Sequence, residues 1–328
     1  MGNGKFVISL DFEIMWGWRD KKNIEDYYGE NLKGVQKVIP RLLETFDAYK
    51  IKATFATVGF LFFENKTELL NNLPVLKPNY LKKELSPYLD EFEKLGENYL
   101  TDTYYYAPHL IRQIQSYKEQ EIGSHTFSHY YCLEEGQTVE AFNADIECAK
   151  KIASKFGINL TSLVFPRNQF NTNYLDVCKQ NGIICIRVNE NSWLYKARSD
   201  DNESLFRRML RLIDAYVNIS GQNCYTDAFL KSTTPMNIPS SRLLRPYFPK
   251  LKMFESLRLQ RIKSGMSYAA KNNQTYHLWW HPHNFGIYQD ENFAFLNKIL
   301  DHYTKLNHTC NFQSYTMSDL TRSLHQSA

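Results

Sequence analysis

Short apolar runs alternate along this chain with longer segments in which apolar residues recur every three or four positions. The short runs predict strands over residues 5–12, 51–63, 120–124, 162–165, 183–188, 275–280 and 312–316. The helical spacing predicts helices over residues 31–50, 109–119, 138–156, 174–180, 203–217, 253–272 and 292–306, and Thr316 or Ser318 is expected to cap a last helix. Strands that alternate with helices predict an α/β fold with a parallel core.

Two segments interrupt this alternation, and we expect both to be insertions over the core. Residues 64–108 are broken by several prolines, and residues 196–250 contain a polar stretch rich in Pro and Ser. A chain of 328 residues can form one large α/β barrel or two smaller domains. The continuous alternation favours a single catalytic domain over residues 1–328.

Composition and charge argue against several classes of protein. A hydrophobic fraction of 43% suffices for a large core and argues against disorder. A net charge of only +4, with both signs interspersed, argues against a nucleic-acid-binding surface. Six cysteines without a CxxC pair fit reduced thiols. Because we find neither a signal-peptide pattern nor an apolar run long enough to cross a membrane, we expect a soluble cytoplasmic protein.

The residues that can bind a metal or exchange protons fall into three clusters, each at the end of an expected strand. Asp11 and Glu13 close the first apolar run, and His125 and His129 follow the run at 120–124. Histidines four residues apart share one face of a helical turn, where both imidazoles can reach one ion. The third cluster closes the run at 275–280 and contains His277, His281 and His283.

The histidine pair is a weak signal when taken alone. Nine histidines in 328 residues produce a pair with this spacing by chance in about one sequence in four. The co-occurrence of the clusters is more informative, because the carboxyl ends of parallel strands meet at one end of a barrel. We therefore expect one shared site, to which Arg167, also at a strand end, contributes.

Four motifs, in this order, resemble the polysaccharide deacetylases of the NodB-homology type, which form carbohydrate esterase family 4. They read LDFE at 10–13, HTFSH at 125–129, FPRN at 165–168 and WHP at 280–282. The resemblance extends from about residue 5 to residue 285 and implies an incomplete (β/α)7-type barrel. The variants FPRNQ and HLWWHPHN look like a branch associated with bacterial surface-polysaccharide biosynthesis.

The resemblance also implies roles for individual residues. Asp11 corresponds to the general base, Arg167 to the cation that orients it, and His281 to the acid that protonates the leaving amine. A divalent metal is implied on Glu13, His125 and His129. Zinc is the expected ion, and cobalt or nickel suits the same ligands. The family has adjacent Asp-Asp where this chain has Asp-Phe-Glu, so the choice between Asp11 and Glu13 as the metal ligand stays open.

The expected substrate is an amino sugar or a glycan intermediate, free or attached to a nucleotide or a membrane lipid. Aromatic rings stack on sugar faces, and arginine can meet an acidic group. The expected substrate contacts are Trp16, Tyr130, Trp280, His283 and Arg242. The pattern does not give the oligomeric state.

The function expected from these residues is metal-dependent removal of an acetyl group, chiefly an N-acetyl group, from a sugar. Two alternatives stay open. The Asp-Phe-Glu variant is also compatible with a metal-free amidohydrolase that acts on a small substrate with a carbon–nitrogen bond. A carbohydrate-binding protein that has kept the barrel but lost catalysis is the third hypothesis.

Overall fold

The computed structural model describes residues 3–197 and 204–326. Within them, the strands form one parallel sheet in the order β6-β5-β4-β3-β2-β1-β8-β7, and β9 pairs with β1. The strands are β1 (Lys5–Phe12), β2 (Ala53–Thr57), β3 (Glu121–Ser124), β4 (Ser162–Val164), β5 (Cys185–Val188), β6 (Met236–Pro239), β7 (Arg242–Leu243), β8 (Thr275–Trp280) and β9 (Gln313–Tyr315).

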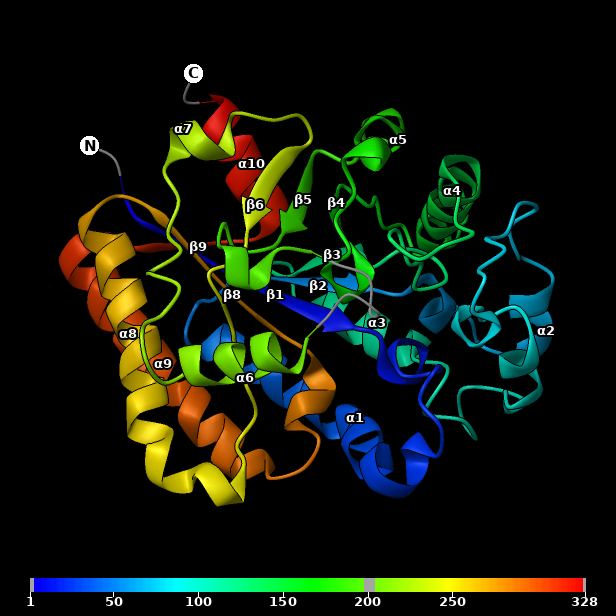
Figure 1. Cartoon of the computed structure of the whole chain (residues 1–328), viewed down its shortest axis with the longest axis horizontal. Coiled ribbons are helices and arrows are strands. Elements are labelled where there is room, and N and C mark those ends of the chain that lie inside the picture. Colours follow the sequence, from blue (N-terminus) through cyan, green and yellow to red (C-terminus); the bar gives the residue numbers. More distant parts are fainter. Residues whose placement is uncertain (1–2, 198–203, 327–328) are drawn as a thin grey trace.

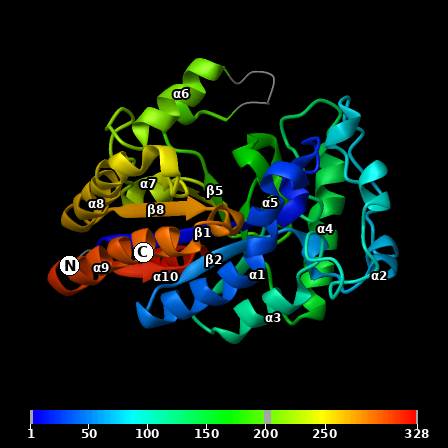
Figure 2. The ribbon, with the colours of Figure 1, turned by 90° about the horizontal axis from the view of Figure 1, so that it is seen from below.

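The helices surround this curved sheet, as Figure 1 and Figure 2 show. They are α1 (Ile24–Ala48), α2 (Lys66–Leu70), α3 (Pro108–Ser116), α4 (Val139–Lys155), α5 (Leu175–Gln180), α6 (Leu205–Asp214), α7 (Asp227–Leu230), α8 (Glu255–Lys271), α9 (Gln289–Cys310) and α10 (Met317–Gln326). All eight residues of β1 are buried. The expected α/β class with a NodB-type incomplete barrel is confirmed.

One segment joins the two ends of the sheet. β6 pairs with β5, and β7, which begins three residues after β6 ends, pairs with β8 at the opposite end. At the bend between them, the backbone N–H of Ser240 donates to Val188, and that of Ser241 donates to His277. The strand path therefore returns on itself at Ser240 and Ser241, and the sheet curls around a shared interior.

The sequence pattern missed this closing segment, because it lies within the stretch 196–250 that was expected to be an insertion. Pro239 ends β6, and the two strands are too short to show an apolar alternation. The expected strand at 51–63 ends at Thr57 and continues as a short 3-10 helix over Gly59–Phe62. Residues 198–203, which include the first residue of the helix expected at 203–217, lie outside the described residues.

The segment 64–108 contains α2 and short 3-10 turns at Lys83–Leu85 and Asp90–Glu93, and no sheet strand within it. α1 runs without a break through Pro40. Thr316 caps α10 as expected, because its hydroxyl accepts from the backbone N–H of Asp319 at 3.0 Å. In the parts of the chain that the structure covers, no helix is both long and apolar enough to span a bilayer.

α1 packs backbone to backbone against the turn that follows β8. A Cβ built on Gly34 would lie 2.2 Å from the carbonyl oxygen of Gly286, and one built on Gly286 would lie 2.0 Å from that of Asn31. The side-chain amide of Asn31 also donates to the carbonyl of His283 at 3.3 Å. Two glycines thus permit the close approach that holds the turn 282–286 at the end of β8.

We predict that Gly34→Ala lowers the free energy of unfolding by about 1–3 kcal/mol, because the added methyl group meets rigid backbone. Denaturant unfolding measures this change. Gly29→Ala is the matched control on the same helix, since its Cβ would meet chiefly the hydroxyl end of Tyr104, at 3.0 Å. It should be neutral or gain up to about 1 kcal/mol from helix propensity. Equal effects of both substitutions would contradict the packing argument.

Candidate active site

The ends of three strands place the candidate residues at one end of the barrel. Asp11 is the second-to-last residue of β1, and Glu13 directly follows the strand. His125 and His129 follow β3. His281 follows β8 directly. Parallel neighbours direct their carboxyl ends to the same edge, so residues far apart in the sequence converge there. The measured distances show how closely they do so.

Asp11 is held by a buried arginine. Arg187 donates from Nη1 to Asp11 Oδ1 and from Nη2 to Asp11 Oδ2, each at 2.6 Å. The same nitrogens donate to Ser9 Oγ at 3.0 Å and to Asn168 Oδ1 at 2.9 Å. The guanidinium carbon lies 4.2 Å from the ring centre of Trp279. Because both partners are buried, the pair has one fixed, bidentate geometry.

The environment keeps Asp11 ionised. Burial alone would raise its pKa, but the guanidinium of Arg187 and the nearby imidazoles of His125 and His281 hold the pKa below its ordinary value. Asp11 is therefore a carboxylate across the neutral range, as a group that accepts a proton must be.

Glu13 lies between two histidine pairs. Its Oε2 is 2.9 Å from Nε2 of His129 and 3.3 Å from Nε2 of His125, and its Oε1 is 3.6 Å from Nε2 of His281. Burial would raise the pKa of Glu13, but the surrounding imidazoles hold it well below its ordinary value. Single ligand atoms of Glu13, His125 and His129 lie within 4.8 Å of one another, and so do those of Glu13, His281 and His283.

The donor atoms of the first group fit a divalent cation. His125 donates from Nδ1 to the carbonyl of Val164 at 2.9 Å, which leaves the lone pair of Nε2 directed toward Glu13. Nδ1 of His129 lies 3.2 Å from Arg19 Nη1, which can only donate, so the proton of His129 is on Nε2. A cation on Nε2 requires this proton to leave, and metal binding here is therefore coupled to proton release or relocation.

His283 is better suited to donate a hydrogen bond than to hold a cation. The indole N–H of Trp18 donates to its Nε2 at 3.2 Å, so the neutral ring carries its proton on Nδ1. Burial and the neighbouring His281 lower the pKa of His283 to about 3, which keeps the ring neutral. Its ring stacks on that of His281 with centres 4.8 Å apart. The set Glu13, His125 and His129 is therefore the stronger candidate for a metal.

The loop that carries the histidine pair is strained and held by one buried acid. Thr126 and His129 both have positive φ, at 62° and 56°, which residues with a Cβ rarely adopt. Asp145 of α4 accepts from the backbone N–H groups of Phe127 and Ser128 at 2.6 and 3.1 Å, and from the Ser128 hydroxyl. These bonds offset the cost of the backbone geometry.

Comparison with known proteins adds the family. The sequence profile of the polysaccharide deacetylase family matches residues 7–186, more than half of the chain. The chain belongs to this family. Its members are hydrolases that act on carbon–nitrogen or ester bonds of sugars. The match covers Asp11, Glu13 and the HTFSH loop but ends within β5, before Arg187 and His281.

Solved structures share the fold at low identity. A protein from Mycobacterium smegmatis assigned as a polysaccharide deacetylase has a TM-score of 0.61 and 11% identity, over 100% of this chain and 92% of that one. One from Pseudomonas aeruginosa has 0.56 and 11%, over 98% and 90%. The PuuE allantoinase also has 0.56 and 11%, over 98% and 90%. No curated protein matches the chain.

Arg187 takes the place that sequence reasoning gave to Arg167. Arg167 instead forms an ion pair with Asp20, and its guanidinium lies 4.4 Å from the ring centre of Tyr131. Arg19 lies 4.5 Å from the same ring. Arg167 thus borders the site without orienting Asp11. The missed signal was Arg187 itself, a charged residue within the apolar run CIRV of the strand expected over residues 183–188.

The expected aromatic contacts lie in the core, and their near neighbours line the site. Three predicted substrate contacts are fully buried, at 0% exposure: Trp16, Tyr130 and Trp280. In contrast, the Trp18 indole contacts His283, Tyr131 packs edge-on against His129 at 5.2 Å, and Trp279 packs against His281 at 5.6 Å. Trp18 is half-buried, whereas Tyr131 and Trp279 are buried, so of these three rings Trp18 is the one that a sugar can approach most directly.

Arg242, another expected substrate contact, lies away from the site and anchors Asp214 instead. It is buried, and its Nη1 donates to the carbonyl and the carboxylate of Asp214 at the end of α6, at 2.9 and 3.0 Å. Glu190, which follows β5, is buried near Ser240.

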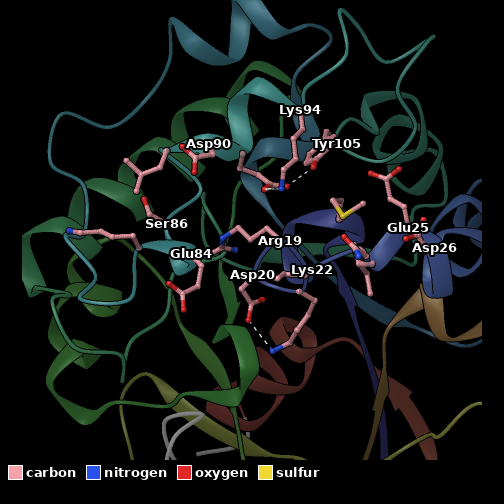
Figure 3. A pocket seen from close by; sticks show the side chains of 17 residues that line it. Arg19, Asp20, Lys22, Glu25, Asp26, Glu84, Ser86, Asp90, Lys94 and Tyr105 are labelled. Carbon is pink, nitrogen blue, oxygen red and sulfur yellow. Dashed lines mark hydrogen bonds and ion pairs between the residues drawn. The ribbon is translucent and has the colours of Figure 1, made fainter.

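A cavity of about 870 Å³ adjoins the site, between residues 15–26 and the segment 64–108 (Figure 3). Its lining carries charges of both signs, including Lys22, Glu84 and Lys94. Arg19 and Asp20 connect it to the site, through His129 and Arg167 respectively. The segment 64–108 thus forms one wall of a polar cavity beside the metal-ligand candidates.

We predict that Arg187→Met lowers the free energy of unfolding by about 3–5 kcal/mol at neutral pH, because it leaves Asp11 charged, buried and unpaired. In the native protein, the low pKa of Asp11 contributes stability above pH 4 that is lost as the pH falls through that pKa. Without Arg187, burial raises the pKa, so the deficit of the variant should shrink toward acid pH.

Denaturant unfolding at pH 5 and pH 7 checks this prediction. Arg112→Met is the control, because Arg112 forms a half-exposed ion pair with Glu64 and should cost no more than about 1 kcal/mol. Arg187→Lys keeps the charge but not the bidentate geometry, and it serves if the methionine variant does not fold. A deficit independent of pH would separate Arg187 from the ionisation of Asp11.

Proposed function

We propose that this protein is a metal-dependent deacetylase that removes an N-acetyl group from an amino sugar in the assembly of a bacterial surface polysaccharide. The observation that carries the proposal is the convergence of Nε2 of His125 and His129 on one oxygen of Glu13, at 3.3 and 2.9 Å, beside the Asp11–Arg187 pair. Family membership supports the reaction class. The FPRNQ and HLWWHPHN variants support the pathway by resemblance.

A divalent ion held by Glu13, His125 and His129 would polarise the acetyl oxygen and acidify a bound water. Asp11 is the base that accepts the proton of the attacking water, and Arg187 fixes its orientation. His281 is the acid that donates a proton to the departing amine. Its Nε2 lies 3.7 Å from Asp11 Oδ2 and 3.6 Å from Glu13 Oε1, so two carboxylates orient it.

The substrate contacts in this proposal come from the rings at the barrel mouth. Trp18, which is half-buried, offers its ring to a sugar, and His283 beside it offers a neutral N–H to a hydroxyl or an acetyl oxygen. The adjacent cavity, with lysines and carboxylates in its wall, suits the polar remainder of a glycan or its carrier.

We predict that the purified protein binds about one equivalent of zinc, cobalt or nickel per chain, and that His125→Ala/His129→Ala loses it. Elemental analysis after metal addition and desalting measures this. His302→Ala is the control, because His302 bonds to Ser267 away from the site. Absence of metal from the wild-type protein would favour a metal-free amidohydrolase, a reading compatible with the fold shared with an allantoinase.

His281→Gln should lower kcat for acetate release from N-acetylated amino sugars by about 10²–10⁴-fold, with KM little changed and the bound metal retained. Asp11→Asn should cause a loss of similar size. Acetate release measured against substrate concentration separates kcat from KM. Turnover that survives either substitution would remove that residue from the catalytic pair, and a wild-type protein that binds sugars without turnover would favour a carbohydrate-binding role.

A further inference from the structure

α6 presents its apolar side to solvent, the reverse of the usual arrangement for a helix on a globular protein. Its exposed large apolar residues fall at positions i, i+1, i+4, i+7 and i+8, which form one continuous face: Leu205, Phe206, Met209, Leu212 and Ile213. Leu205 is 81% exposed, Phe206 62% and Met209 49%. Val217, just after the helix, is 56% exposed and extends this face.

The two residues of α6 that are buried are charged, and they fix how the helix is turned. Arg207 donates from Nη2 to the backbone carbonyls of Trp193 and Leu194, at 3.0 and 2.9 Å. Asp214 accepts from the backbone N–H of Ser220 at 2.8 Å and from the Tyr195 hydroxyl at 2.8 Å. It also pairs with the buried Arg242 described above.

This buried polar network anchors both ends of the helix, so rotating the apolar face inward would leave Arg207 and Asp214 without their partners. The outward orientation of the apolar side chains is therefore built into the fold. Figure 2 shows α6 standing out from the body of the molecule. A soluble monomer rarely exposes a continuous apolar face of this kind without a partner for it.

Among the residues of α6 and the turn before α8 that the structure describes, basic side chains outnumber acidic ones. Among the described residues 204–219, the charged residues are Arg207, Arg208, Arg211 and Asp214, and the one acid is neutralised by Arg242. The start of α8 lies beside the helix, since the rings of Tyr216 and Phe254 are 6.1 Å apart. The preceding turn adds exposed Lys250 and Lys252, and Met253 there is exposed too.

We propose that this face, which we call the α6 surface (Leu205, Phe206, Met209, Leu212, Ile213 and Val217 with Arg208, Lys250 and Lys252), docks on the surface of an anionic lipid bilayer. Apolar side chains that enter the acyl boundary while flanking Arg and Lys meet anionic headgroups are how amphipathic helices bind in the interface plane. A second copy fits less well, because a twofold contact would place Arg208, Lys250 and Lys252 of the two copies close to one another. The proposal stands independently of the catalytic one.

Sedimentation of the full-length protein with vesicles tests the proposal. We expect binding to phosphatidylcholine vesicles that contain about 30% phosphatidylglycerol, weaker binding to pure phosphatidylcholine, and a decrease with added salt. Phe206→Ser/Met209→Ser should weaken binding by about tenfold or more, because it removes apolar side chains from the interface. Arg208→Gln should weaken binding to the anionic vesicles more than to the neutral ones.

The matched control is Val75→Ser/Leu76→Ser, which removes two exposed apolar side chains from the segment 64–108 and should bind like the wild type. Unchanged melting temperatures show that both double variants are folded. The proposal is overturned if the wild type does not bind anionic vesicles, or if both double variants lose binding equally. Light scattering that finds a wild-type dimer and a monomeric Phe206→Ser/Met209→Ser variant would assign the face to a second copy instead.

Discussion

The bidentate ion pair between Arg187 and Asp11 is the interaction on which the arrangement of the site depends. It crosses the interior of the barrel from β5 to β1, and each charge would be costly there without the other. Ser9 and Asn168 extend the network to the middle of β1 and to the loop after β4. The ion pair fixes the separation of β1 and β5 across the barrel. It thereby also fixes the position of Glu13, which lies two residues after Asp11.

The loops around the pair contain an unusual concentration of left-handed backbone. Ile14, Thr126, His129, Arg167 and Asn168 all have positive φ, and each follows a strand that contributes to the site. A side chain in this region costs about 1–3 kcal/mol unless its surroundings hold it. The contacts that do so are polar and buried, as with Asp145 under the HTFSH loop. The left-handed backbone that positions the candidate ligands thus lowers local stability, and buried polar contacts offset this cost.

The sequence predicted the α/β class and most element positions, because apolar runs and helical spacing report burial directly. It also predicted which strand ends bring Asp11, Glu13 and the histidines together. What it could not resolve was the direction of single side chains. Trp16, Tyr130 and Trp280 were chosen, whereas Trp18, Tyr131 and Trp279 border the site. For β8, the two-residue period from His281 already pointed to Trp279.

Contacts across the barrel were beyond the reach of the sequence for a different reason. Arg187 and Asp11 are 176 positions apart, and no local pattern links an arginine on one strand to a carboxylate on another. The sequence pattern did not predict the closing segment either, because β6 and β7 are short and each pairs with a different strand, β6 with β5 and β7 with β8. The role of Arg242 as an anchor for Asp214 was hidden in the same way.

The closing segment also determines the order in which the chain can become compact during synthesis. When the ribosome has made β1 to β5, β1 and β5 are both open edges, and all eight residues of β1 are buried in the folded protein. Open parallel edges are templates for aggregation. They are covered only after residues 236–243 and 275–280 have emerged. Nascent chains that stall before this point expose an unpaired apolar strand edge, and the edge of β1 stays open until the residues just before His281 have been made.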